Sequence, residues 1–157
     1  MDDGSNEQIL ILSKDGDFKQ LQRFANVKQF DPISNVWITT PDPGKYLLEH
    51  IMRGEPAVGD AIPNVFSPDD SFVMNKRQKS LTKGRMEALM RLEFESEDVK
   101  RNFERNRMLI DLSYIPNDIK AAIMNKYNET TNKDRSKLMN YFIEFRLKTL
   151  MSNINDF

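Results

Sequence analysis

The 157-residue sequence contains no cysteine and a single histidine, His50. The absence of cysteine excludes disulfide bonds, thiol catalysis and cysteine-ligated zinc within these residues. One histidine cannot supply a multi-histidine site, so we expect any metal chemistry to depend on carboxylates. His50 lies between apolar neighbours in a predicted helix, which indicates a packing residue rather than a catalytic one.

Long apolar runs are also absent. No segment approaches the length of a membrane span, and no signal-peptide hydrophobic region follows Met1. Charged residues make up 30% of the chain and hydrophobic residues 39%, which predicts a soluble, ordered protein of one or two compact units. We therefore expect no membrane partner.

Four consecutive apolar residues, Ile9 to Leu12, are followed by two aspartates one glycine apart, Asp15 and Asp17. Such a run predicts a strand buried on both faces of a parallel sheet. Ligand sites in open α/β sheets lie just beyond the carboxyl ends of such strands, and paired carboxylates suit Mg²⁺ or Mn²⁺. The alternative is a strand-end turn with an aspartate helix cap.

The rest of the chain predicts a small sheet followed by helices. Strands are expected at 26–30 and 35–39, and helices at 17–24, from the stretch 40–44 to about 53, and at 81–94, 98–112, 116–128 and 134–153. The predicted fold class is an α/β partial parallel sheet followed by an all-helical domain. The predicted domains are residues 1–65 and 66–157.

The first predicted strand has too few neighbours. A strand that is apolar on both faces needs sheet partners on both sides and helices above and below. Residues 26–39 supply two strands at most, so we expect these residues to represent an α/β domain only in part. The alternative is a small three-stranded sheet capped by helices, which would leave apolar strand surface poorly covered.

A glycine- and proline-containing loop after the helix that ends near residue 53 carries two more acids, Glu55 and Asp60. Such a loop can turn its carboxylates toward a common point. Two-metal phosphoryl chemistry needs several acids around ions roughly 3.5–4 Å apart. The candidates are Asp15, Asp17, Glu55 and Asp60. An acidic surface loop is the alternative, and the sequence leaves open which of Glu55 and Asp60 contacts an ion.

Residues 76–85 carry five basic residues and no acidic one, in a chain of net charge −1. This block indicates a polyanion partner, and the alternative is a solvated loop and helix start. Contacts of these residues to phosphates would give affinity and salt dependence without recognition of the base sequence. Residues 76–85 contain no aromatic residue, which argues against stacking on the bases of a single strand there. The candidate DNA-binding residues are Lys76, Arg77, Lys79, Lys83 and Arg85.

Several segments resemble the flap endonuclease or 5′-nuclease family, in particular its T-even-type phage ribonuclease H members. The segments, in the same order as in the family, are 9–21 with its Asp-Gly-Asp, 26–30, 54–55 with 60–63, 109–116 and 153–157. Glu55 stands where the family usually has aspartate. Glu55 and Asp60 also lie two residues further apart than in the family pattern.

The resemblance implies a divalent-metal-dependent 5′–3′ exonuclease and flap endonuclease that removes RNA primers and 5′ flaps during phage DNA replication in the host cytoplasm. It implies two Mg²⁺ or Mn²⁺ ions held by Asp15, Asp17, Glu55 and Asp60, of which Asp15, Asp17 and Asp60 are the catalytic set. Residues 1–65 would be the second half of the catalytic domain, and residues 66–157 a DNA-binding domain with a helix-hairpin-helix-like start. The implied partners are duplex DNA and RNA–DNA hybrids with a 5′ flap, and a single-strand-binding protein or clamp of the replisome.

In the family, further metal-binding acids and the first strands of the sheet precede the region resembled here. We therefore expect a separately encoded amino-terminal polypeptide, unless the chain is a truncated descendant. The alternative function is a non-catalytic DNA-binding or replisome-interaction module derived from such a nuclease. The retention of Asp15 and Asp17 argues against it, because two close carboxylates repel each other unless a cation lies between them.

Overall fold

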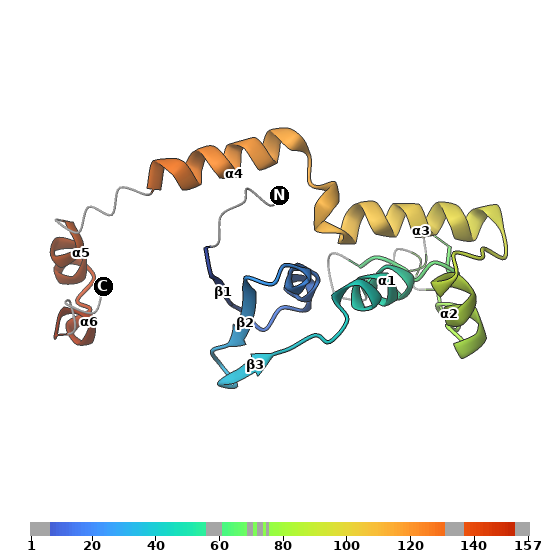
Figure 1. Cartoon of the computed structure of the whole chain (residues 1–157), viewed down its shortest axis with the longest axis horizontal. Helices are drawn as coiled ribbons and strands as arrows, with labels where there is room; N and C mark the ends of the chain where they lie inside the picture. Colours follow the sequence, from blue (N-terminus) through green and yellow to red (C-terminus); the bar gives the residue numbers. More distant parts are fainter. Residues whose placement is uncertain are drawn as a thin grey trace. The chain divides into compact units, whose positions relative to one another are not determined.

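The computed structural model describes residues 7–55, 61–68, 71, 74, 76–130 and 137–152. By its internal contacts the chain divides into two compact units, Met1–Tyr114 and Ile115–Phe157. The elements of the first unit (Figure 1) are β1 (Ile9–Leu12), the 3₁₀ helix η1 (Gly16–Arg23), β2 (Val27–Asp31), β3 (Val36–Ile38), α1 (Pro43–Arg53), α2 (Lys83–Met90), α3 (Glu97–Ile110) and the 3₁₀ helix η2 (Leu112–Tyr114). The elements of the second unit are α4 (Asn117–Thr130), α5 (Leu138–Glu144) and α6 (Lys148–Ser152).

The three strands form one mixed sheet in the order β1-β2-β3. β1 pairs with β2 in parallel, and β2 pairs with β3 antiparallel. The short turn between β2 and β3 permits only a hairpin, whereas η1 lies in the longer crossover that a parallel pair needs. A partial sheet followed by helices is therefore confirmed, but the sheet is not purely parallel as predicted.

The prediction that β1 is buried on both faces is wrong for this chain. Ile9 is 47% exposed, Leu10 53% and Leu12 62%. β1 lies at the edge of the sheet, and among the described residues only β2 is hydrogen-bonded to it. The observed arrangement is the alternative considered above, a small three-stranded sheet whose apolar surface is poorly covered.

The core of the first unit lies among α1, α2, α3 and the loop 61–68. Its buried residues are Ile51, Met52, Val65, Phe66, Leu89, Val99, Phe103 and Ile110. Each of the three helices begins at a side-chain cap, since Asp42, Thr82 and Ser96 accept hydrogen bonds from backbone N–H groups of the first turn. The core thus joins α1, which carries part of the candidate site, to the helices that follow in the sequence.

Two buried asparagines of α3 hold the loop 61–68 against the core. Asn106 donates to the carbonyls of Ile51 and Pro63 at 2.9 and 3.0 Å. Asn102 donates to the carbonyls of Val65 and Ser67 at 3.0 and 3.2 Å. These bonds satisfy loop carbonyls that are removed from water. They also connect residues on both sides of position 65, where the predicted domain boundary, which stays a prediction, would fall.

The second unit consists of the 14-residue helix α4 and the shorter helices α5 and α6. The predicted single helix over 134–153 is divided, because Arg146 adopts a positive φ of 53° between α5 and α6. Phe142 on α5 is buried, whereas Ile119, Ile123 and Tyr127 on α4 are exposed. Within the described ranges, no helix has the length and apolar character needed to cross a lipid bilayer.

Candidate metal centre

The loop after β1 is fixed by hydrogen bonds from its own and neighbouring side chains. The carboxylate of Asp15 accepts the backbone N–H of Asp17 at 3.1 Å and so caps η1. The amide of Gln29, which is buried on β2, donates to the carbonyls of Ser13 and Asp15 at 2.8 and 2.7 Å. The pairing of β1 with β2 therefore determines the backbone path on which Asp15 and Asp17 lie.

η1 is anchored to the rest of the unit through two glutamines. Gln20, which is 2% exposed, donates to the carbonyl of Ile110 at 3.1 Å and accepts the N–H of Leu112 at 3.0 Å. Gln22 donates to the carbonyl of Ile38 at 3.1 Å. Because both amides bond to main-chain groups of other elements, η1 is held by the end of α3 and by β3.

Glu55 is positioned by the end of α1. Gly54 terminates this helix with a φ of 67°, and Glu55 then pairs with Ile62 in an antiparallel bridge. The bridge has backbone N–H to carbonyl distances of 2.9 and 2.6 Å. The bridge fixes the main chain of Glu55, and its carboxylate contacts His50 in the last turn of α1.

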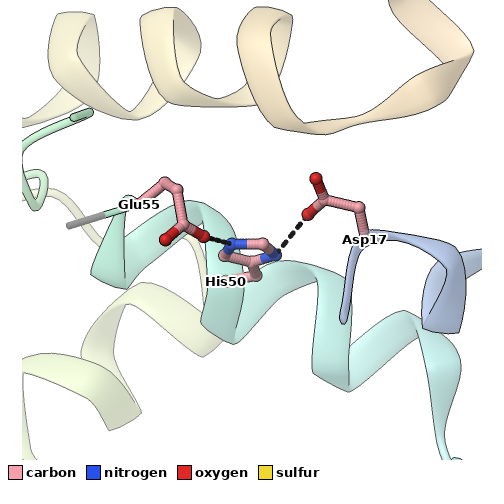
Figure 2. A group of neighbouring side chains, drawn as sticks. All are labelled: Asp17, His50 and Glu55. Carbon is pink, nitrogen blue, oxygen red and sulfur yellow. Dashed lines mark hydrogen bonds and ion pairs between the residues drawn. The ribbon is translucent and has the colours of Figure 1, made fainter. Parts of the chain in front are cut away.

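His50 lies between the carboxylates of Asp17 and Glu55 (Figure 2). Its Nε2 is 3.1 Å from Oε2 of Glu55, and its Nδ1 is 3.6 Å from Oδ1 of Asp17. The ring is 13% exposed, and within the described part of the chain Nδ1 makes no hydrogen bond. Three elements thus converge, since Asp17 comes from η1, His50 from α1 and Glu55 from the bridge that follows α1.

Negative charge accumulates at this site. Burial raises the pKa of Asp17, His50 opposes this rise, and the carboxylates of Asp15 and Glu55 reinforce it. Burial also raises the pKa of the Tyr46 phenol, and Asp17, Glu55 and Asp15 act in the same direction. These shifts mark a place where an added cation is electrostatically favoured.

The donor set fits a divalent cation. Asp17, His50 and Glu55 each offer one ligand atom, and these atoms lie within 4.8 Å of one another. Carboxylate oxygens suit Mg²⁺ and Mn²⁺, and an imidazole nitrogen is a common ligand of transition metals. The two carboxylates contact the two nitrogens of the ring, so the imidazole of His50 can itself bridge Asp17 and Glu55.

The structure brings together two of the four predicted metal-binding residues, Asp17 and Glu55. Asp15 caps the helix η1 that carries Asp17, and its carboxylate acts on the pKa of Asp17. Asp60 lies outside the described residues. His50 was expected only to pack, and the structure instead places its ring against the carboxylates of Asp17 and Glu55.

The basic block has a fixed backbone. Ser67 Oγ accepts the N–H of Lys79 at 2.9 Å, and the carbonyl of Lys79 accepts the side-chain amide of Asn64 at 2.9 Å. Lys76, Arg77 and Lys79 are exposed in this segment. Their side chains therefore project from a main chain that is tied to the loop 61–68.

Arg85 differs from the other members of the block. Its guanidinium donates to both carboxylate oxygens of Glu95, at 3.2 and 3.1 Å, and to the carbonyl of Ser80 at 3.1 Å. It also lies over the ring of Phe66, 4.5 Å from the centroid. Lys83, by contrast, is 91% exposed, with Nζ 3.8 Å from Glu87. The charge of Arg85 is thus largely balanced within the chain.

Two comparisons with known proteins give a consistent result. Residues 46–157 match a family model described as the C-terminal region of T4 RNase H. The chain is also 30% identical over 160 residues to ribonuclease H of Enterobacteria phage T4, in a match that covers 96% of this chain and 52% of that protein. The chain therefore spans about half the length of the curated relative that it matches.

Proposed function

The chain belongs to the family of the T4 RNase H C-terminal region, and from this membership we propose that it is the carboxyl-terminal part of a phage 5′–3′ exonuclease and flap endonuclease. The proposed reaction is hydrolysis of phosphodiester bonds, which removes RNA primers and 5′ flaps in the host cytoplasm. The observation that carries the proposal is the convergence of Asp17 and Glu55, which are far apart in sequence, at the carboxyl end of β1. Carboxylates in that place are what metal-dependent phosphoryl chemistry requires.

We assign the binding of two Mg²⁺ or Mn²⁺ ions to Asp15, Asp17, Glu55 and Asp60. Bound divalent cations lower the pKa of an attacking water and stabilise negative charge on the scissile phosphate. Asp15, Asp17 and Asp60 form the proposed catalytic set. The proposal extends to Asp60 through the family pattern only, because Asp60 lies outside the described residues.

The surrounding side chains keep the acids in place and limit their charge. Gln29 holds the main chain of the loop that carries Asp15, so this carboxylate needs little reorganisation. The pKa of Tyr46, already about 10 for a tyrosine in water, is raised further, so the phenol is protonated at neutral pH and adds no negative charge to the cluster. His50 lies between Asp17 and Glu55 and keeps their carboxylates apart.

We propose that the basic block grips duplex DNA or an RNA–DNA hybrid beside the metal centre. Lys76, Arg77, Lys79 and Lys83 are exposed and would contact phosphates. Arg85 belongs to the predicted set, but its bonds to Glu95 give it a positioning role for the segment. Such contacts give affinity without sequence reading, which suits a nuclease that recognises the structure of its substrate.

Residues 1–65, as the second half of the proposed catalytic domain, would need the first half of that domain for cleavage. The match covers 52% of the T4 relative, and we propose that an amino-terminal nuclease polypeptide corresponding to the unmatched part of that relative completes the catalytic domain. A single-strand-binding protein or a clamp of the replisome stays a prediction to which we assign no surface.

The proposal is tested with 5′-flap and RNA–DNA substrates in Mg²⁺ or Mn²⁺. We expect cleavage when the chain is mixed with the amino-terminal polypeptide, and loss of cleavage with Asp17→Asn while duplex binding is retained. Asp118→Asn, an exposed carboxylate on α4, is the matched control and should cleave normally. Equal cutting by Asp17→Asn would contradict the metal assignment.

A second candidate is a non-catalytic DNA-binding or replisome-interaction module. One observation favours it, since the ring nitrogens of His50 already contact the carboxylates of Asp17 and Glu55. In that case no divalent cation would bind and no mixture would cleave, although duplex binding would persist. Titration with Mn²⁺ followed by its electron paramagnetic resonance signal distinguishes the two candidates, because free and bound Mn²⁺ give different spectra.

A further inference from the structure

A cavity of about 460 Å³ lies where β2 and β3 diverge. The antiparallel pairing ends at Gln29 and Ile38. Beyond it, the N–H of Thr40 bonds to the side-chain oxygen of Gln22 at 2.8 Å rather than to β2. The chain after β3 therefore leaves the sheet and opens a hollow beside the start of β2. Its volume falls within the range of small-molecule sites, about 300–1,000 Å³.

Two aromatic side chains line this cavity, Phe24 and Trp37. Trp37 is 61% exposed, and Phe30 on the neighbouring strand packs edge-on against it, with ring centroids 5.1 Å apart. The indole is thus supported by the sheet while much of its surface stays open. An aromatic ring in this state is a platform on which a nucleobase can stack.

The charge at the cavity is positive. Lys28 is exposed and lines the cavity, and the described residues of the lining include no acid, in a chain with 24 acidic residues. Phe30 pairs with Trp37, and side chains two positions apart on a strand point to the same side, so Lys28 lies on the same face as the indole. The cavity therefore favours a ligand that combines an aromatic ring with a negative group.

The hydrogen-bonding groups of the lining are used unequally. The amide of Gln22 donates to Oε1 of Gln29 and to the carbonyl of Ile38, both at 3.1 Å, and so belongs to the frame of the cavity. Oγ1 of Thr40, by contrast, is buried and has no hydrogen-bond partner within the described part of the chain. A buried hydroxyl without a partner costs free energy, and the polar edge of a base can supply the missing group.

We propose that this cavity binds one nucleotide of a single-stranded nucleic acid, with its base stacked on Trp37 and its phosphate on Lys28. Every base has a π face, so this contact requires no particular base sequence. The site is separate from the metal centre, because Val27 at the cavity pairs with Ile9 at the start of β1, whereas Asp15 follows the end of that strand. The inference goes beyond the proposed function and does not depend on cleavage.

Trp37 is the only tryptophan of the chain, so its fluorescence reports directly on the cavity. The probe is a six-residue oligothymidylate, and we expect it to quench this fluorescence in a saturable manner. An abasic oligomer with the same number of phosphates is the matched ligand control. It keeps the charge but has no base to stack, so it should leave the fluorescence nearly unchanged.

Variants separate the stacking contact from the phosphate contact. Affinity is measured by the fluorescence anisotropy of fluorescein-labelled oligothymidylate, which does not need the tryptophan. Trp37→Ala should weaken binding about 5- to 150-fold, whereas Trp37→Phe should retain most of the affinity because a ring can still stack. Ile33→Ala is the matched control, since Ile33 is 78% exposed in the turn of the same hairpin, and it should bind normally.

Lys28→Gln should reduce the salt dependence of binding to oligothymidylate by about 0.7 in the slope of log affinity against log salt, as expected for one phosphate contact to a single strand. Lys148→Gln, an exposed lysine on α6, is the control for the loss of one charge and should leave the slope unchanged. Circular dichroism spectra that match the unsubstituted chain verify that the variants fold.

Three outcomes would overturn the inference. The first is the absence of saturable quenching at strand concentrations of up to about 1 mM. The second is equal quenching by the abasic oligomer, which would indicate phosphate binding alone. The third is a Trp37→Ala protein that binds as tightly as Ile33→Ala, which would place single-strand binding elsewhere. Failure of the proposed function differs from all three, because cleavage would be absent while Trp37 was still quenched.

Discussion

Replacement of Gly54 should damage the candidate metal centre without changing any metal-binding side chain. Gly54 ends α1 with φ 67° and ψ −170°, a backbone conformation essentially restricted to glycine. A Cβ atom there would overlap the carbonyl oxygen of Ile62 and lie 2.8 Å from the carbonyl carbon and oxygen of Pro63. These are main-chain atoms, so they cannot rotate away as a side chain could.

The magnitude of the effect has two contributions. Holding alanine in this backbone conformation costs roughly 1–3 kcal/mol. Displacement of Ile62 would break its two backbone hydrogen bonds with Glu55, each worth about 1 kcal/mol. We expect Gly54→Ala to lower the free energy of unfolding by about 3–5 kcal/mol. Gly54→Ala should also weaken Mn²⁺ binding, because Glu55 directly follows the substituted residue.

Urea denaturation followed by circular dichroism measures the change in stability, and electron paramagnetic resonance measures Mn²⁺ binding. Gly84→Ala in α2 is the matched control, since no atom lies within 4 Å of its added Cβ. The control should stabilise the chain by about 0.5–1 kcal/mol, because alanine is the better helix former. A Gly54→Ala protein with unchanged stability and unchanged Mn²⁺ affinity would refute the reasoning.

Three further predictions concern single side chains. Because the pKa of Asp17 is higher in the folded than in the unfolded chain, the free energy of unfolding should fall as pH rises through the unfolded and then the folded pKa. Asp17→Asn should therefore melt at a higher temperature than the unsubstituted chain at neutral pH in EDTA, and the difference should be smaller in acid. A lower melting temperature for Asp17→Asn at neutral pH would contradict this. Asn106→Leu should cost about 1–3 kcal/mol in urea denaturation, since the buried carbonyl of Ile51 loses its donor and that of Pro63 keeps only the Arg105 guanidinium at 3.3 Å; unchanged stability would mean that water replaces the lost donor. Lys83→Ala should reduce the salt dependence of duplex binding by about one phosphate contact and leave stability unchanged. Arg85→Ala should instead lower the melting temperature of the protein. The reverse pattern would exchange the roles assigned to Lys83 and Arg85.

The positions of most elements were predictable because their signals are local. Alternation of short apolar runs with turn residues located β2 and β3, and the sequence Asp42-Pro43 marked the start of α1. The end of α2 was predicted too late, since the helix stops at Met90 and Leu92 adopts a φ of 58°. That turn packs Phe94 edge-on against Phe103, a contact between residues whose proximity the local pattern does not encode.

The candidate site was predictable in its acids but not in its arrangement. Asp15, Asp17 and Glu55 were recognised because carboxylates after a strand and in a glycine-containing loop indicate a metal site. Their residue types and spacing are properties of the sequence alone. The role of His50 was missed because a histidine among apolar residues in a helix gives no indication of which residues it will face.

The sequence by itself determined the strands, the helices, their caps and the positions of the charged residues, since these depend on neighbours a few positions away along the chain. Contacts between distant segments required the folded chain. The packing of α1 beside η1 brings the His50 ring between Asp17 and Glu55, and the position of β1 at a sheet edge leaves its leucines exposed. Both features depend on which segments lie next to each other in space, and periodicity in a sequence reports only which face of an element is apolar, not what will cover it.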